Sequence, residues 1–444
     1  SFQAYTATRN QAPDSIALLA PGVVANTAAA AASPARLGGV LPLTPTNAQG
    51  RAFALHPVMG TLQTMFNTDR RLAIVPNIGP LVMPTTKTQY GQSTHPKPAS
   101  LFSHNDQQNT WQALAPEGAS AGWGGRMGDL VASANTQPVF TTVSASGNSI
   151  WLAGRSVRQY QVGGAGAVRL GLDSNNRVYG STDVGLALQR IASNARGTHL
   201  FEGDLAAVGK RSIDAELLLR GALKPASDAA FGTPVTSGNY NPNSDPKLQF
   251  ENPLNGAKSF NPVAQQLQVV ARMIEAGISG AAGTARQVFF VSLGGFDTHG
   301  QQNRDQAELM AKLAHALRYF DTTLGALNAR SNVTTFTASD FGRTFTSNGD
   351  GTDHGWGSHH FVMGGAVKGG DLYGNYPVVG MKNTTNNNFD SSPNQLGNGA
   401  MLPETAVDQL GATLGKWFGL NDSQLLDIFP NLKNFTTRDL GFMV

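Results

Sequence analysis

Two short apolar runs joined by one long amphipathic helix constrain the fold of this chain more than any other feature. Residues 288–293 and 333–338 have the composition of buried strands, and between them, from about residue 305 to residue 327, apolar side chains repeat at helical spacing. A strand–helix–strand unit of this length predicts a crossover that returns the second strand parallel to the first. We therefore expect the carboxyl ends of both strands at one edge of a sheet.

Carboxylates and histidines follow both predicted strands closely. Asp297 and His299 come after the first strand, Asp340 comes after the second, and the glycine-rich loop beyond it adds Asp353 and His354. Open α/β sheets place their sites at this edge, and carboxylate oxygens and imidazole nitrogens within about 2.0–2.6 Å of one centre bind divalent cations. Each residue alone is equally typical of a helix cap, a turn or a structural hydrogen bond. As a set they predict a metal-centred hydrolytic site.

Other polar residues nearby are open to two interpretations. His359 and His360 are adjacent in a predicted strand and point to opposite faces, so at most one of them can face the site. Arg343 could bind an anionic substrate oxygen through two N–H groups, or it could form a salt bridge to a neighbouring carboxylate.

A second polar cluster lies upstream, at residues 101–108. Ser103 could serve as a nucleophile assisted by His104 or Asn105. It could also cap a helix that runs toward Trp111, and the spacing alone favours the cap.

Composition excludes several classes of protein. The chain has 444 residues with 32 basic and 29 acidic side chains and no basic run longer than Arg70-Arg71, so we expect no nucleic-acid partner. It has no cysteine, and no apolar run is long enough to predict a membrane span. The length allows one large α/β domain or two ordinary ones. The low charge content of 14% and the 51 glycines favour an exported protein with long loops, at about 224–261 and 374–400. No signal-peptide pattern opens the sequence, so we expect that any such segment has been removed.

Several motifs together resemble a bacterial family of exported proteins, domain of unknown function 1501. They are Gly-Gly-Phe-Asp-Thr-His-Gly, Ser-Asp-Phe-Gly-Arg-Thr, Gly-Thr-Asp-His-Gly-Trp-Gly, Leu-Phe-Ser-His-Asn-Asp-Gln-Gln and the closing Phe-Thr-Thr-Arg-Asp-Leu-Gly-Phe, at residues 294–300, 339–344, 351–357, 101–108 and 435–442. The resemblance implies export by the twin-arginine route and a distant relationship to alkaline phosphatases and sulfatases. It also implies a doubly wound α/β fold, with a mostly parallel central sheet and helices on both faces, in a single domain over residues 1–444.

The resemblance further implies a two-metal site whose metal-activated groups attack a phosphate or sulfate ester. Asp297, His299 and His354 would hold one divalent ion (zinc, calcium, magnesium or manganese), and Asp340 would belong to the other. Ser103 gains weight as the nucleophile, because the related enzymes place theirs near the start of a helix.

The chain departs from the family pattern in two places. The second-metal motif normally has histidine after its aspartate, whereas Phe341 follows Asp340 here, so one ligand is either missing or supplied from elsewhere, by His104 or His359. Family members also begin with a buried strand ending in Gly-Gly-Asn-Asp, and Ser1–Tyr5 resembles the segment just after it. A central parallel strand is buried on both faces and is hard to remove. We therefore predict that a strand-donating peptide or a second chain fills its place.

Two functions follow from these observations. The first is an exported metal-dependent hydrolase of phosphate or sulfate esters, periplasmic or extracellular, with an anionic ester as its substrate. The alternative is a non-catalytic extracellular protein on a degenerate phosphatase-like scaffold, which binds surface polymers or assembles with itself. A serine hydrolase ranks last, because the chain has no Gly-x-Ser-x-Gly motif around Ser103.

Overall fold

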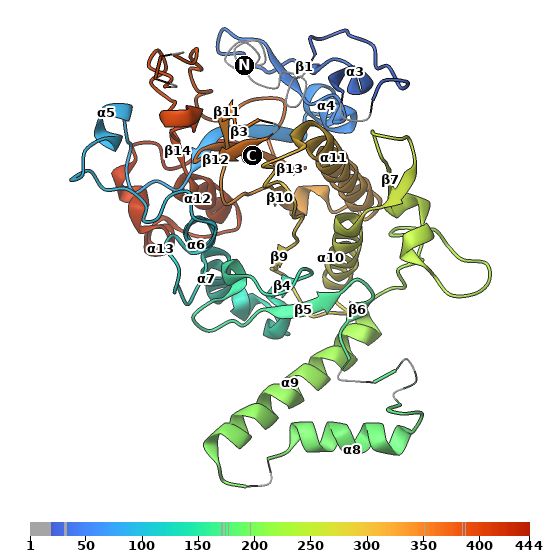
Figure 1. Ribbon diagram of the computed structural model, residues 1–444. Coiled ribbons are helices and arrows are strands. Elements are labelled where there is room, and N and C mark those ends of the chain that lie inside the picture. The colour runs from blue at the N-terminus through green and yellow to red at the C-terminus, as the bar shows by residue number, and fades with distance from the viewer. Residues whose placement is uncertain are drawn as a thin grey trace.

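The computed structural model describes residues 19–30, 33–169, 172–173, 175, 177–195, 197–349, 351–383, 385–386 and 388–444. It is an α/β structure in which helices surround two four-stranded sheets (Figure 1). The segment Ser1–Tyr5, which suggested an added strand, lies outside these residues. Within the described residues, no helix combines the length and the apolar character that a membrane span requires.

The first sheet is mixed. Its order is β10 (Thr334–Phe336), β13 (Ser358–Gly364), β3 (Leu72–Gly79) and β14 (Thr405–Ala406). Strand β13 runs antiparallel to both β10 and β3, whereas β14 is parallel to β3. All eight residues of β3 are buried, as expected for a central strand covered on both faces.

The second sheet has the order β6 (Gly166–Ala167), β5 (Tyr160–Gly163), β4 (Thr142–Ser144) and β9 (Val288–Phe290). Strand β4 is parallel to both β5 and β9, and β5 and β6 form an antiparallel hairpin. Strands β4, β5 and β9 thus form the parallel part of this sheet.

Helices cover both faces of the sheets. Helices α10 (Pro262–Ile278) and α11 (Gln302–Ala326) pack on one face, and α6 (His104–Ala113), α7 (Trp123–Val131), α12 (Val407–Trp417) and α13 (Asp422–Ile428) lie on the other (Figure 1). Alternate residues of β3 enter different cores: Leu72 and Ile74 join the core of α10 and α11, and Ala73 and Val75 join the other. This alternation is the pattern of a strand between two helical layers.

The arrangement of β9 and β10 differs from the predicted parallel pair. Both strands exist, they are shorter than predicted, and α11 connects them, but each is the edge strand of a different sheet. The central sheet is therefore two mixed sheets rather than one mostly parallel sheet. The crossover pattern fixes the direction of two strands, but it does not require them to be hydrogen-bonded neighbours.

Shorter elements complete the fold. The predicted loop 224–261 contains the hairpin of β7 (Gln249–Glu251) and β8 (Lys258–Phe260), and helices α8 (Thr182–Ser193) and α9 (Leu200–Ala222) extend from the second sheet (Figure 1). The remaining elements are α3 (Pro34–Leu37), β1 (Leu41–Leu43), β2 (Phe53–Leu55), α4 (Gly60–Asn67), α5 (Lys87–Tyr90), β11 (Arg343–Ser347), β12 (Thr352–His354) and the 3-10 turns Ala132–Ala134, Pro138–Phe140, Ile150–Leu152, Pro242–Ser244, Pro246–Leu248, Arg330–Asn332, Gly397–Gly399 and Pro430–Asn434.

Candidate metal centre

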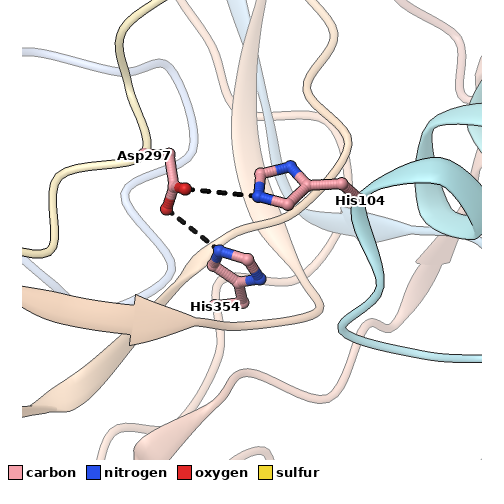
Figure 2. Close-up of side chains that lie close together, drawn as sticks. All are labelled: His104, Asp297 and His354. Carbon is pink, nitrogen blue, oxygen red and sulfur yellow. Dashed lines mark hydrogen bonds and ion pairs between the residues drawn. The ribbon is translucent and has the colours of Figure 1, made fainter.

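Three segments that are far apart in the sequence bring His104, Asp297 and His354 together (Figure 2). His104 is the first residue of α6, Asp297 lies in the segment that leads from β9 to α11, and His354 is the last residue of β12. One ligand atom from each side chain lies within 4.8 Å of the other two. A cluster of imidazole and carboxylate groups at this spacing has the composition of a divalent cation site.

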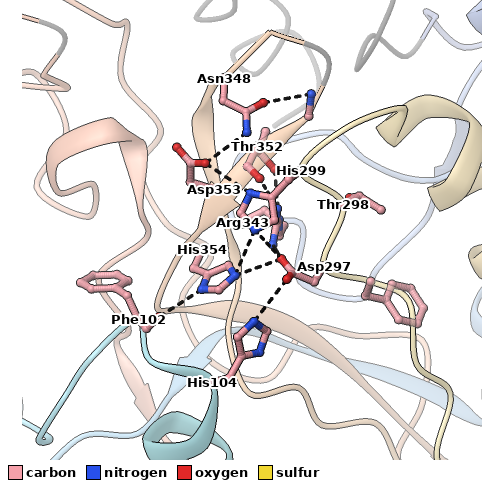
Figure 3. A network of polar contacts seen from close by, with 12 residues as sticks. Phe102, His104, Asp297, Thr298, His299, Arg343, Asn348, Thr352, Asp353 and His354 are labelled. Atoms are coloured by element: carbon pink, nitrogen blue, oxygen red, sulfur yellow. Dashed lines mark hydrogen bonds and ion pairs between the residues drawn. The ribbon is translucent and has the colours of Figure 1, made fainter.

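Asp297 is the centre of the cluster, and His299 is a fourth member of it (Figure 3). The Oδ1 atom of Asp297 lies 2.9 Å from His299 Nε2 and 3.0 Å from His354 Nε2. The Oδ2 atom of Asp297 lies 3.2 Å from His104 Nε2. The two Nε2 atoms of His299 and His354 are 3.2 Å apart. Ligand atoms about 2.1 Å from one ion are separated by about 3.0 Å in an octahedral site and about 3.4 Å in a tetrahedral site. The spacings around Asp297 are therefore those of neighbouring ligand atoms, and His104, Asp297 and His354 are the three residues whose ligand atoms all lie within 4.8 Å of one another.

The hydrogen-bond partners on the side of each histidine ring away from Asp297 indicate which ring nitrogen points a lone pair at Asp297. His354 Nδ1 lies 3.0 Å from the carbonyl oxygen of Phe102, which can only accept, so Nδ1 carries the proton. His299 Nδ1 faces Asp353 Oδ1 at 3.4 Å. In the neutral imidazoles both Nε2 lone pairs then point at the Asp297 carboxylate. A cation between these groups, or a proton on one ring, relieves the repulsion, and such second partners are characteristic of metal-binding histidines.

Arg343 controls the charge and the orientation of Asp297. Partial burial acts to raise the pKa of Asp297, but the hydrogen bond from Arg343 and the nearby charges of His354, Arg343 and His299 outweigh it and hold that pKa below its usual range. The Arg343 Nη1 atom lies 2.5 Å from Asp297 Oδ1. Asp297 is therefore an ionised carboxylate whose orientation is fixed by the Arg343 guanidinium group.

The same contacts decide between the two interpretations of Arg343. Its Nε donates to Thr352 Oγ1 at 3.1 Å, and its Nη2 donates to the Thr352 carbonyl oxygen. The side chain is only 17% exposed. The structure thus shows the salt bridge to a neighbouring carboxylate, and the guanidinium fork is occupied by the protein itself.

Asp340 reaches the cluster through His104. Its Oδ2 atom lies 3.5 Å from His104 Nδ1, on the ring nitrogen that faces away from Asp297. Phe341, which stands where the family resemblance implies histidine, stacks on His354 at 4.0 Å and packs edge-on against His104 at 4.8 Å between ring centroids. His104 therefore bridges Asp297 and Asp340, and Phe341 packs against two of the imidazoles.

His359 and His360 lie outside this cluster. His359 Nδ1 accepts a hydrogen bond from the Asn77 N–H at 3.0 Å, and its ring stacks on Tyr376. Its accessible surface faces an internal cavity, and burial within the protein lowers its pKa to about 4. His360 is buried, and this lowers its pKa to about 3. Both rings are neutral at ordinary pH, and neither contacts Asp297.

Ser103 occupies the N-cap position of α6, as its spacing predicts, but its side chain makes no capping hydrogen bond. Its hydroxyl has no hydrogen-bond partner within the part of the chain that the structure describes. The preceding residue, Phe102, has a φ of 74°, which is unusual for a residue with a side chain and is typical of functional sites. This turn brings the Phe102 carbonyl to His354.

Sequence reasoning missed the groups that support the ligands from behind. These are the Phe102 carbonyl, Thr352 and Asn348, whose Nδ2 lies 3.2 Å from Asp353 Oδ1 (Figure 3). A backbone carbonyl has no side-chain signature, so no pattern could have identified the first. The position of Thr352 and Asn348 in the β11–β12 hairpin was the only available signal for the other two.

Comparison with known proteins gives one finding. The model of a family described as protein of unknown function (DUF1501) matches residues 249–429, which include Asp297, His299, Asp340, Arg343 and His354. No curated protein and no solved structure matches the chain. The match supports the family resemblance found in the sequence, and it covers every cluster residue except His104.

Proposed function

We propose that this chain is a metal-dependent hydrolase of phosphate or sulfate esters that works in the periplasm or outside the cell on an alkaline phosphatase-like scaffold. The observation that supports this best is the convergence of three imidazoles on the Asp297 carboxylate, with spacings of 2.9 to 3.2 Å. Hydrolases use such sites, because a divalent cation stabilises charge on the ester oxygen and makes water a stronger acid.

The proposed ion is held by His104, Asp297 and His354, and His299 lies beside them with its Nε2 atom 2.9 Å from Asp297 Oδ1. Imidazole-rich sites with one carboxylate favour zinc or another first-row transition metal over calcium and magnesium, which prefer all-oxygen sites. Of the four metals that the sequence left open, zinc and manganese therefore fit this cluster better.

The remaining residues position the ligands and the substrate. Arg343 keeps Asp297 ionised and oriented, and the Phe102 carbonyl keeps the Nε2 of His354 free of a proton. Asp340, 3.5 Å from His104 Nδ1, accepts the N–H of that ring nitrogen and so leaves Nε2 free to face the ion. Ser103 is the proposed nucleophile, because its half-buried hydroxyl directly precedes His104 and is not committed to a capping bond.

Elemental analysis and turnover assays test the proposal together. Protein purified without chelators should contain a stoichiometric transition metal and should hydrolyse 4-nitrophenyl phosphate or 4-nitrophenyl sulfate. Asp297→Asn should lose both properties, whereas Ser103→Ala should keep the metal and lose turnover. His199→Ala changes an exposed histidine far from the cluster in sequence and serves as the control. Metal-free protein that behaves like Asp297→Asn would contradict the proposal.

A non-catalytic binding protein is the second candidate. It is favoured by the edge strands β9 and β10, which belong to different sheets and both line one large cavity. Bound metal without turnover of either ester, combined with binding of a peptide strand, would support this function instead.

A further inference from the structure

Helices α8 and α9 form an arm that extends from the second sheet, away from the rest of the structure (Figure 1). The carboxyl-terminal half of α9 belongs to the body of the protein, because Ala215 and Leu219 are buried in one core with Val269 and Met273 of α10. The amino-terminal half of α9 extends beyond this core and packs against α8. The arm is therefore a pair of helices that is anchored at one end only.

A stripe of mostly apolar side chains repeats along α9 at alternating spacings of four and three residues, which place it on one face of the helix. The stripe consists of Phe201, Leu205, Val208, Ser212, Ala215 and Leu219. Its last two residues are buried in the core, whereas Phe201 is 75% exposed and Leu205 is 72% exposed. The face that anchors α9 to the body thus continues along the arm, where no described residue covers it.

Helix α8 adds to the same side of the arm. Val184 and Ile191 are both exposed and are seven residues apart, so they share one face of α8. The other side of the arm is a shallow groove lined mostly by polar side chains, which include Asp183, Gln189, Arg190, Lys210 and Asp214. Successive residues are rotated by about 100° around a helix axis, so both stripes lie on the side opposite this groove. We call this side the apolar face; it consists of Val184, Ile191, Phe201, Leu205 and Val208.

The contact between α8 and α9 is made by small residues. Gly185 and Ala206 are buried, and a Cβ atom on Gly209 would lie 2.2 Å from the Ala192 carbonyl oxygen. An amphipathic helix normally turns its large apolar side chains toward its packing partner. In this arm the small residues face each other and the large apolar ones face outward. This distribution is typical of one half of a larger helical bundle.

The size of the apolar face suits a protein interface. Helix α8 has 12 residues, which at about 1.5 Å per residue make the face about 18 Å long, and two helices about 10 Å in diameter make it about 20 Å wide. The face therefore covers about 360 Å² in projection, the size at which an exposed apolar patch marks an interaction site. Burying it on two copies of the chain removes more than about 700 Å², and its corrugated surface brings the total close to about 1,000 Å², as in a small specific interface.

The charges of the arm fit a protein partner better than a membrane. Helices α8 and α9 together carry four basic and five acidic side chains. Helices that lie on membranes have a polar face rich in lysine and arginine, which anionic lipids attract. The polar side of this arm instead combines both signs, as in the ion pair of Lys210 with Asp214 at 2.8 Å. An anionic lipid surface would therefore not attract the arm.

Two charged residues beside the apolar face indicate which protein the partner is. Asp204 and Arg211 are exposed, lie seven residues apart along α9 and occupy the edge of the stripe that points away from α8. Neither forms an ion pair with another described residue. When two copies are related by a two-fold axis, α9 meets the α9 of the other copy in the antiparallel direction, and each Asp204 faces the Arg211 of the other copy. The surface is therefore complementary to itself.

We propose that two copies of this chain associate through the apolar face, so that α8 and α9 of both copies form an antiparallel four-helix bundle. Phe201, Leu205 and Val208 of the two copies pack against one another in its core, and two pairs of Asp204 with Arg211 flank them. The antiparallel arrangement places the two bodies at opposite ends of the bundle, where they do not collide. The small area of the interface makes this dimer one that dissociates on dilution.

Sedimentation velocity of the full chain at about 1 to 100 µM tests the proposal. The wild type should form dimers whose fraction rises with concentration. Leu205→Glu places a charge in the middle of the apolar face and should weaken dimerisation at least tenfold. Leu186→Glu introduces the same charge on the groove side of α8, at a leucine that is 57% exposed, and should leave dimerisation unchanged.

Exchanging the two charges separates a lost interface from a folding defect. Asp204→Arg and Arg211→Asp should each weaken dimerisation, because each places like charges opposite each other in the bundle. The double variant should recover the dimerisation of the wild type, since it restores two opposite-charge pairs. A mixture of the two single variants should form a heterodimer for the same reason.

Several outcomes would overturn the proposal. They are a monomer at every concentration, a dimer that Leu205→Glu leaves intact, and a double variant that dimerises no better than the single ones. Flotation with vesicles of phosphatidylcholine and phosphatidylglycerol tests the membrane as the partner instead, and a monomer that binds these vesicles through Leu205 would also overturn it. None of these measurements depends on ester hydrolysis, so the dimer and the hydrolase function are tested separately.

Discussion

Asp408 should make the stability of this protein fall as the pH rises from about 4 to about 7. It lies in the first turn of α12, its side chain is buried, and its Oδ1 atom has no hydrogen-bond partner. Burial raises the pKa of Asp408 from 3.8 to about 7, although amides of Asp408 and Asn431 offset part of the effect. The folded protein thus holds this proton at a pH where the unfolded chain has released it.

The sign and the size of this change in the free energy of unfolding follow from proton linkage. Between pH 4 and pH 7 the folded state binds more protons than the unfolded state, so the free energy of unfolding decreases as pH rises and levels off above pH 7. A difference of about three pKa units corresponds to about 4 kcal/mol at pH 8. The N-terminus of a helix stabilises a carboxylate by at most about 2 kcal/mol. The effect of burial is therefore larger than that of the helix N-terminus, and ionised Asp408 reduces the free energy of unfolding by a net amount of about 2–4 kcal/mol.

The assay is urea unfolding of the wild type and of Asp408→Asn at pH 4, 6 and 8, followed by tryptophan fluorescence. Asparagine keeps the shape and removes the titration, so the variant should equal the wild type at pH 4 and exceed its stability by about 2–4 kcal/mol at pH 8. Asp427→Asn, at a site that is 64% exposed, is the control and should show a difference that hardly varies with pH. A pH-independent difference for Asp408→Asn would refute the reasoning.

Three further predictions concern the cluster and the packing of α12. Zinc or manganese at 100 times its Kd should stabilise the fold by about 2.7 kcal/mol, which is about 3 °C in Tm for a chain of this length, and Asp297→Asn should show no shift. Arg343→Lys should weaken metal binding by about 10–100-fold in a chelator competition, because lysine cannot hold Asp297 and Thr352 together, and an unchanged affinity would exclude this role. Gly411→Ala should destabilise by about 1–3 kcal/mol in urea, because its Cβ would lie 2.3 Å from the Phe429 ring, whereas Gly221→Ala in α9 meets no atom within 4 Å and should be neutral or stabilising.

The sequence predicted the centre of the site because a topological rule links it to sequence position. Asp297 and Asp340 follow strands that run in the same direction, and this brought both to one end of the structure although the strands are in different sheets. The rule depends on strand direction and connection, which hydrophobic periodicity records. His354 was predicted from its place in the glycine-rich loop after Asp340, which could fold back over the same edge.

The sequence could not predict what depends on backbone conformation or on neighbours along the sheet. The Phe102 carbonyl reaches His354 because Phe102 has a positive φ, and a phenylalanine in the sequence does not predict that conformation. The antiparallel strand β13 pairs with β10, which nothing in the pattern of residues 333–338 specified. An unfilled strand position was expected from the family resemblance alone, and the pattern of the two runs did not place it between them. The role of Arg343 was open for a related reason, because partner choice is a matter of tertiary contact.

The metal cluster and the cavity are parts of one arrangement. His104, Asp297 and Asp340 line the same cavity as β9 and β10. His104 is 50% exposed and Asp297 is 35% exposed, values that are high for ligands that a hydrolytic site shields from bulk water. A bound substrate that covered both side chains would lower the local dielectric and so strengthen the attraction between Asp297 and a cation. Substrate and metal would then favour each other's binding by the same factor, because coupling between two sites is reciprocal.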